Sequence, residues 1–98
     1  MHNDVYNGSM RFTWNEVKRK ANIRKHGLDF ADAYKVFAGP TFTFEDTRFS
    51  YGEQRWITIG LCSLSVVVIA HTETEDEIHI ISMRKGEKHE QEIFFKNL

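Results

Sequence analysis

The chain has little of several residue types that mark particular classes of protein. Its 98 residues include one proline and one cysteine, and Cys62 alone cannot form an internal disulfide, which argues against a disulfide-stabilised secreted domain. No apolar run reaches the roughly 18 residues that a membrane-spanning helix needs. Residues 1–9 lack the charged and then apolar pattern of a secretory signal. These absences favour a soluble protein of the reducing cytoplasm.

The sequence also lacks the motifs of the commonest nucleotide-binding, hydrolytic and metal sites. It contains no GxGxxG, GxxxxGK[ST], CxxC, GxSxG or HExxH pattern. His89 and Glu90 begin like the last of these, but Ile93 stands where the second histidine is needed. The five histidines, which share no metal-ligand spacing, are His2, His26, His71, His79 and His89. We therefore expect neither a metal nor a cofactor.

What is present suits one small domain. Hydrophobic residues make up 41% of the chain, aromatic residues 13% and charged residues 28%, which is enough apolar material for a core. The length is that of a single domain. Because residues 1–9 are polar and show no periodicity, we expect them to be a flexible leader or an expression remnant outside the fold. Residues 10–98 are then the domain.

The charge is nearly balanced overall but unevenly distributed. The formal net charge is -1, which does not indicate a protein that grips nucleic acid over a wide surface. Residues 1–27, however, contain six Lys or Arg and two Asp or Glu. Residues 28–98 contain seven Lys or Arg and twelve Asp or Glu. An anionic ligand is therefore expected to meet a local basic patch.

Periodicity predicts one strand and two helices in the N-terminal part. Met10–Trp14 alternates apolar and polar residues and is short enough for an edge strand. Asn15 is a suitable N-cap for a helix that runs to His26, and Gly27 suits its left-handed C-cap. Asp29 is the expected cap of a second helix. The apolar residues that share one face of that helix are Phe30, Ala33, Tyr34 and Phe37.

Beyond Gly39 and Pro40 the pattern changes from helical to alternating. Four strands are predicted, at residues 41–46, 54–61, 64–71 and 77–83, with connections short enough for an antiparallel meander. The charged segment after Gly86 predicts a helix that docks through Ile93 and Phe94. The predicted class is α+β, with an antiparallel sheet of about four strands plus a short N-terminal strand, two N-terminal helices and a C-terminal helix.

One face of the first predicted helix carries positive charge. Lys18, Asn22 and Lys25 are spaced by four and three residues and so share a face, with Val17 and Ala21 on the neighbouring stripe. The face either binds phosphate or is simply solvated, opposite a stripe that belongs to the core. The charge pattern alone favours the second interpretation.

Two residues of the predicted strands are candidates for chemistry. Arg55 alternates in phase with Ile57, toward the core-facing side, and either grips a phosphate or pairs with Glu53 or Asp46. His71 ends an apolar strand, where it either acts as a general base or is hydrogen-bonded to the backbone.

Two further charged stretches have equally open interpretations. Arg84 and Lys85 follow the last predicted strand and either reach a phosphate across the end of the sheet or mark a solvated turn. The acidic residues 73–77 form either a solvated hairpin tip or a surface for a partner rich in Lys and Arg.

Three longer stretches carry a recognisable set of motifs, FTWNEVKRKANIRKHGLDFADAYKVF, FEDTRFSYGEQRWITIGL and VVVIAHTETEDEIHIISMRK, which cover most of residues 11–85. The first contains Trp14, Asn15, Lys18 with Arg19, Asn22, Lys25, His26, Gly27 and Phe30. The second contains Gly52, Glu53 and Arg55, and the third contains Ile80, Ile81, Ser82, Arg84 and Lys85. In these motifs the chain resembles the BrnT family of toxins from bacterial type II toxin-antitoxin systems.

This resemblance implies an endoribonuclease of RelE-like fold that inhibits translation by cleaving RNA. It implies neutralisation by a BrnA-like antitoxin, and contact with DNA only through that antitoxin, which represses their shared operon. Cleavage is implied to need no metal, with the RNA 2′-hydroxyl attacking the adjacent phosphate. Such a reaction needs a base, cations around the phosphate and an acid for the leaving oxygen.

The resemblance also implies roles for particular residues. Arg55 and Arg84 are the implied phosphate clamps, and His71 and Glu53 are the candidates for proton transfer. The residues implied for RNA binding are Lys18, Lys25, His26 and Lys85. The chain departs from the family at His79, where members commonly carry a basic residue, and at Gly86, where they carry alanine. The first departure keeps open an alternative, a non-catalytic module that binds the antitoxin or serves as an operon co-repressor.

Overall fold

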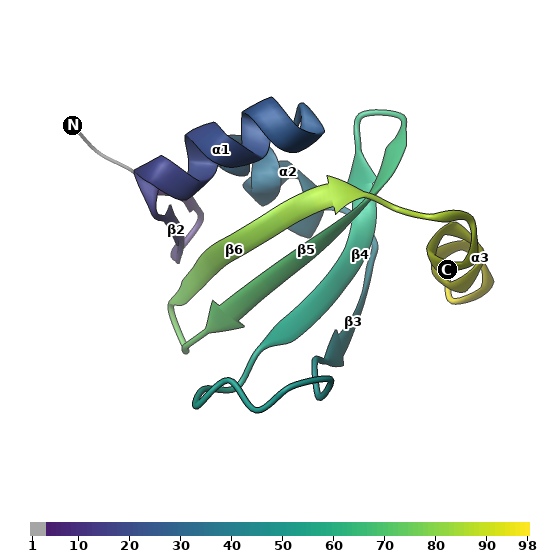
Figure 1. Ribbon diagram of the computed structural model, residues 1–98. Helices are drawn as coiled ribbons and strands as arrows, with labels where there is room; N and C mark the ends of the chain where they lie inside the picture. The colour runs from purple at the N-terminus through teal and green to yellow at the C-terminus, as the bar shows by residue number, and fades with distance from the viewer. Residues whose placement is uncertain (1–3) are drawn as a thin grey trace.

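The computed structural model describes residues 4–98, which form one curved sheet with helices packed around it (Figure 1). The elements in chain order are β1 (Asp4–Asn7), β2 (Met10–Trp14), α1 (Glu16–His26), a 3₁₀ turn (Phe30–Asp32), α2 (Ala33–Phe37), β3 (Thr41–Glu45), β4 (Trp56–Cys62), β5 (Ser65–Glu73), β6 (Glu77–Lys85) and α3 (Lys88–Lys96). None of the helices in this part of the chain is long and apolar enough to cross a membrane.

The sheet has six strands, and it is mixed. The prediction of an antiparallel sheet of about four strands plus a short N-terminal strand is therefore wrong. The strand order is β1-β2-β6-β5-β4-β3. Strands β3 to β6 pair antiparallel with their neighbours in sequence, but β2 lies parallel to β6. Parallel neighbours need a long crossover connection, and here everything from α1 to β5 separates the pair. Local turn signals therefore carried no information about it.

The sixth strand lies in the segment that was expected to stand outside the fold. Asp4–Asn7 pairs antiparallel with β2, and Val5 packs against the core. Gly8, at φ 65°, takes the left-handed conformation that turns the chain between the two strands. A strand of four mostly polar residues gives no clear alternation. Residues 1–3 of the predicted leader lie outside the described residues.

The prediction of two N-terminal helices also needs correction. The first is as expected: Asn15 Oδ1 accepts the Lys18 N–H at 3.0 Å, and Gly27 closes the helix at φ 69°. The second is only a 3₁₀ turn followed by five helical residues. Asp29 caps the turn by accepting the Ala31 N–H at 2.9 Å, and Pro40 keeps the helix from extending.

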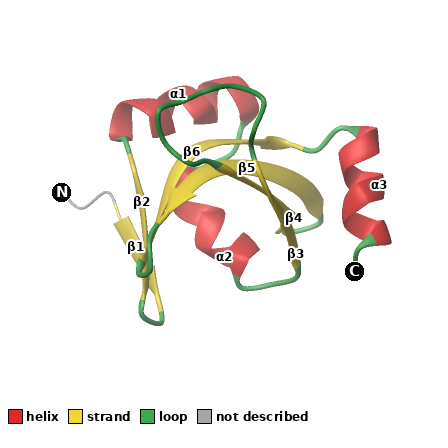
Figure 2. Cartoon of the chain, turned by 90° about the horizontal axis from the view of Figure 1, so that it is seen from below, coloured by secondary structure: helices red, strands yellow, loops and turns green. Residues whose placement is uncertain are grey.

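One face of the sheet, here the covered face, packs beneath the 3₁₀ turn and α2. Its core consists of buried apolar side chains from β2, β5, β6 and this helical segment: Phe12, Trp14, Phe30, Ala33, Val36, Val67, Ile69, Ile78, Ile80 and Met83. Figure 2 shows α2 against the sheet, on the side away from α1. This cluster holds most of the buried apolar side chains among the described residues.

Helix α1 attaches to the sheet through a polar contact. Asn22 is 8% exposed; its Nδ2 donates to the carbonyls of Met83 at 2.8 Å and Leu28 at 3.0 Å, and its Oδ1 accepts the Met83 N–H at 3.3 Å. Because β2 pairs with β6 only as far as Ile80, Asn22 takes the place of a strand neighbour beyond that point. Val17 is 76% exposed, so the apolar stripe beside Lys18 is not core.

The opposite face, here the open face, packs against α3 at one end (Figure 2). Phe94 of α3 is buried against a smaller cluster that includes Ile57, Ile59, Val66 and Val68. Because side chains alternate along a strand, the residues out of phase with the covered core point to this face. The polar ones are Arg11, Thr13, Arg55, Thr72, Glu77, His79, Ser82 and Arg84.

Candidate functional site

Arg84 lies on the open face beside the start of α3. Its Nη1 and Nη2 donate to the two carboxylate oxygens of Glu90, both at 2.7 Å. Glu90 Oε1 also accepts the N–H of Glu87 at 2.8 Å, as part of the capping box of α3. The hydrogen bonds between them raise the pKa of Arg84 and lower the pKa of Glu90. A helix terminus thus fixes the orientation of the guanidinium group.

A cavity of about 220 Å³ opens beside Arg84. Its lining residues are Phe44, Arg48, Ile57, Val68, Arg84, His89 and Glu90. This lining combines three apolar side chains with two guanidinium groups, an imidazole and a carboxylate. An aromatic ring beside apolar side chains can stack on a nucleic-acid base, and guanidinium groups in the same lining suit the neighbouring phosphates.

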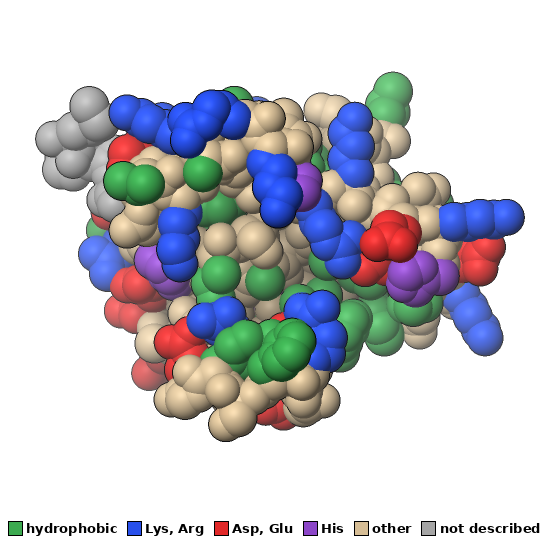
Figure 3. Space-filling model, in the orientation of Figure 1, with side chains coloured by type: hydrophobic (Ala, Val, Ile, Leu, Met, Phe, Trp, Pro, Cys, Tyr) green, Lys and Arg blue, Asp and Glu red, His purple; other side chains and the backbone are tan. Residues whose placement is uncertain are grey.

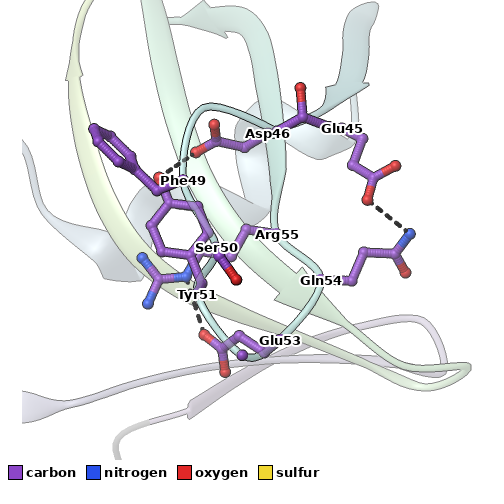
Figure 4. A pocket seen from close by; sticks show the side chains of 10 residues that line it. Glu45, Asp46, Phe49, Ser50, Tyr51, Glu53, Gln54 and Arg55 are labelled. Atoms are coloured by element: carbon purple, nitrogen blue, oxygen red, sulfur yellow. Dashed lines mark hydrogen bonds and ion pairs between the residues drawn. The ribbon is translucent and has the colours of Figure 1, made fainter.

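The second arginine is held by the loop between β3 and β4. Arg55 Cζ lies 4.0 Å from the centre of the Tyr51 ring, and its Nε donates to Glu53 at 3.0 Å. Figure 4 shows these side chains around a pocket of about 460 Å³. Stacking and an ion pair restrain the Arg55 side chain on both sides.

Asp46 anchors the same loop. It is buried and accepts hydrogen bonds from Arg48 Nε at 2.9 Å, Arg48 Nη2 at 3.0 Å and the Tyr51 hydroxyl at 3.0 Å. The bonds from Arg48 hold the pKa of Asp46 at about 2. Since Arg48 also lines the Arg84 cavity, it connects the two arginines that the sequence singled out. Lys and Arg side chains surround the middle of the view in Figure 3.

The basic residues of α1 lie next to the strand that carries Arg84. Asn22 contacts Met83, the residue before Arg84, and Lys18 and Lys25 stand about one helical turn to either side of Asn22. Both lysines are exposed, and His26 is partly exposed. Lys85, directly after Arg84, is exposed as well. The structure therefore gathers the predicted RNA-binding residues along one edge of β6.

Of the two predicted proton-transfer residues, Glu53 is accessible and His71 is enclosed. His71 is 0% exposed, its Nε2 lies 2.7 Å from Thr58 Oγ1, and its ring meets Phe37 edge-on at 5.1 Å. His71 alternates in phase with Val67 and Ile69, so it points to the covered face. Burial lowers its pKa to about 4. His71 is thus not brought together with Arg55 or Arg84.

Residues 14–90 match the family model described as ribonuclease toxin, BrnT, of type II toxin-antitoxin system. The chain belongs to the BrnT family. The predicted family is thereby confirmed. BrnT proteins are ribonuclease toxins, which implies an RNA target and an antitoxin partner. No curated protein matches the chain in sequence.

The BrnT match spans several residues that reasoning from the sequence missed. Arg48, Tyr51 and Glu90 were not among the predicted site residues, although each contacts or adjoins one of the two arginines. A signal existed for Glu90, because Glu87 and Glu90 have the spacing of a capping box immediately after Arg84. For Arg48, the signal was its position two residues after Asp46, within a stretch that carries the family motif.

Metal ligands are not gathered in the part of this BrnT chain that the structure describes. Residues 4–98 contain no group of three or more His, Cys, Asp or Glu side chains arranged to hold a metal ion. The chemical groups that meet on the open face are guanidinium groups, carboxylates and imidazoles, which bind phosphate and move protons.

Proposed function

We propose that this BrnT chain is an endoribonuclease that binds cytoplasmic RNA across the open face and cleaves it without a metal. Three arginines on that face, Arg48, Arg55 and Arg84, carry the proposal. Each is held by a carboxylate, and Arg48 and Arg84 line the same cavity. Such preorganised cations are what a phosphate transition state requires, since they stabilise developing charge without reorganising.

In this mechanism the ribose 2′-hydroxyl attacks the adjacent phosphorus and the bond to the 5′-oxygen breaks. Arg84 uses Nη1 and Nη2 for Glu90, and its Nε–H has no hydrogen-bond partner among residues 4–98. Arg55 bonds to Glu53 through Nε, so this bond does not use its two Nη groups. These remaining donors are the groups that contact the phosphate oxygens.

The other predicted residues take supporting roles. We assign Lys18, Lys25, His26 and Lys85 to flanking phosphates, because they line the edge of β6 without reaching the cavity. Glu53 positions Arg55. His71, enclosed behind the sheet, belongs to the core in this scheme and does not touch RNA.

For the partner, we propose a BrnA-like antitoxin that also provides the only link to DNA. The turn between β5 and β6 offers it an acidic surface. Glu73, Glu75 and Asp76 are exposed there, and Thr74 braces the turn by donating to Asp76 at 3.2 Å. A partner segment rich in Lys and Arg complements this charge.

The test uses purified chain, freed of any antitoxin, incubated with mixed RNA in EDTA. We expect discrete fragments that end in 2′,3′-cyclic phosphate. Arg55→Ala and Arg84→Ala should each slow cleavage by about 10²- to 10³-fold. Arg24→Ala is the matched control, because Arg24 is exposed on α1 and lies on the side away from Asn22.

The outcomes separate the proposed enzyme from the alternative binding module. Absence of cleavage by the unmodified chain, even with ribosomes added, favours a module that only binds its antitoxin. Cleavage that survives both arginine substitutions keeps the enzyme but removes these two residues from its site.

A further inference from the structure

A hydrogen-bonded row of four side chains lies on the open face, away from α3. The parallel pairing of β2 with β6 places Arg11 opposite Glu77 and Thr13 opposite His79. The guanidinium group of Arg11 pairs with the Glu77 carboxylate. Thr13 Oγ1 donates to Glu77 Oε2 at 3.0 Å and lies 2.8 Å from Nδ1 of His79.

Counting the protons in this row fixes the tautomer of the neutral His79 imidazole. The hydrogen bond from Arg11 lowers the pKa of Glu77, so the Glu77 carboxylate is ionised and only accepts. Thr13 has a single hydroxyl proton, which it donates to Glu77. Thr13 must therefore accept from His79, and the neutral ring carries its proton on Nδ1 and its lone pair on Nε2.

The basic nitrogen that results is accessible from the open face. His79 is partly exposed, and Nε2 has no hydrogen-bond partner within residues 4–98. The charged groups that face the ring are Glu77 and, through it, Arg11, whereas the neighbour on β5 is the neutral Thr72. A histidine held through Nδ1 with a free Nε2 has the arrangement of a general base.

The register of the sheet also places His79 level with Arg55. Thr72 is paired with His79, and His71 with Trp56. Arg55 directly precedes Trp56, the first paired residue of β4, and the same register continued by one residue sets Arg55 beside Thr72. Two strand spacings separate the backbones of Arg55 and His79, about 10 Å. A ribose and its phosphate lying over Thr72 are within reach of both side chains.

We propose that His79 is the general base of the ribonuclease reaction, with Thr13 and Glu77 as the positioning residues that aim its Nε2 at the ribose 2′-hydroxyl. The inference rests on the proposed ribonuclease function. His79 Nε2 takes the 2′-hydroxyl proton as the 2′-oxygen bonds to phosphorus. The bond from phosphorus to the 5′-oxygen breaks, and that oxygen takes a proton from water. The hydroxide left behind neutralises the imidazolium, so atoms and charge balance.

The principal variant is His79→Asn, because its amide N–H replaces the Nδ1–H that Thr13 accepts while the basic nitrogen is lost. Single-turnover rates are measured between pH 5 and pH 9 on an RNA with one cleavage site. Affinity is measured on the same RNA with a 2′-deoxyribose at that site. We expect a rate loss of about 10²- to 10⁴-fold, disappearance of the acid limb of the pH profile and unchanged affinity. Added imidazole should restore part of the rate to His79→Ala.

A matched pair of Thr13 variants tests the positioning residue. It also tests the inference independently if the His79 variants do not fold. Thr13→Val removes the hydroxyl and keeps the shape, whereas Thr13→Ser keeps the hydroxyl. Thr13→Val should lower the rate by about tenfold or more, corresponding to the removal of a hydrogen bond of about 1.4 kcal/mol, and Thr13→Ser should not.

Three results overturn the inference. An unmodified chain that cleaves RNA, together with an equally active His79→Asn, removes His79 while leaving the ribonuclease proposal intact. A His79→Asn variant that loses affinity and keeps its rate makes His79 a binding residue. An unmodified chain that cleaves nothing removes the ribonuclease proposal and the base with it.

Discussion

The two faces of the sheet are built from the same strands and differ in how they treat polar groups. On the covered face, alternate residues of β2, β5 and β6 are buried apolar side chains, and the polar His71 among them is held neutral. On the open face, the intervening positions carry charge, and each of Arg11, Arg55 and Arg84 pairs with a carboxylate. One face therefore supplies stability, and the other supplies oriented charges at little cost to folding.

The largest difference is expected when an aromatic side chain is truncated on each face. Phe30 is 1% exposed on the covered face, whereas Phe44 is 41% exposed on the open face. Phe30→Ala should lower the free energy of unfolding by about 3 to 5 kcal/mol, because it leaves a cavity. Phe44→Ala should cost less than about 1 kcal/mol. Urea unfolding measures both, and similar losses would contradict the division between the faces.

Acid should destabilise the covered face first. The pKa of His71 falls from 6.5 to about 4 on folding, so the unfolded chain binds the proton more readily. Stability is then full above pH 6.5 and declines by an amount on the order of 3 kcal/mol as the pH falls to about 4. His71→Gln keeps a polar partner for Thr58 and should flatten this part of the curve measured by thermal unfolding.

The loop on the open face should respond in a separate range of pH. The pKa of Asp46 falls from 3.8 to about 2 on folding, so its contribution is present above pH 3.8 and is lost as the pH falls to about 2. Asp46→Asn should remove the loss of stability between pH 3.8 and about 2 and leave the loss near pH 4 to 6.5 unchanged. If His71→Gln also removed the first of these losses, the two ranges would not belong to different faces.

A smaller effect is expected where α1 closes the edge of β6. Asn22→Ala leaves the buried N–H and C=O of Met83 without side-chain partners, at a cost of about 1 to 3 kcal/mol. Hydrogen exchange at the Met83 amide should quicken. Lys20→Ala, two residues away on α1, is the control and should change neither measurement.

The smallest effect should appear in binding without any change in stability. Lys18→Ala with Lys25→Ala removes two exposed charges beside β6. The slope of log affinity for single-stranded RNA against log salt should fall by about 0.7 for each phosphate that the chain no longer neutralises. Lys20→Ala again serves as the control. An unchanged slope would place these lysines away from the RNA.

Reasoning from the sequence succeeded where the signal was local. The bounds of α1 followed from Asn15 and Gly27, whose side-chain bond and left-handed φ need no distant contact. The family followed from motifs contained in continuous stretches. The antiparallel pairing of β3 to β6 followed from short connections.

It failed where distant parts of the chain decide the outcome. The pairing of β2 with β6 joins residues 66 positions apart, and His71 is enclosed by Phe37 and Thr58, which come from α2 and β4. Helix α1 also misled, since a buried asparagine and an exposed valine reverse the usual pattern of an amphipathic helix. The contacts of Arg48 and Glu90 arise only once the loop and α3 meet the sheet.

The carboxylate of Glu90 serves two structures at once. Its Oε1 accepts both the Glu87 N–H of the helix cap and the Arg84 guanidinium. The first turn of α3 and the direction of Arg84 are therefore thermodynamically linked, and linkage is reciprocal. The free energy by which the folded turn stabilises the orientation of Arg84 equals the free energy by which Arg84 stabilises the turn. The C-terminal helix, although it contributes one buried aromatic ring, thus determines how firmly the Arg84 guanidinium group, which we propose binds phosphate, keeps its orientation.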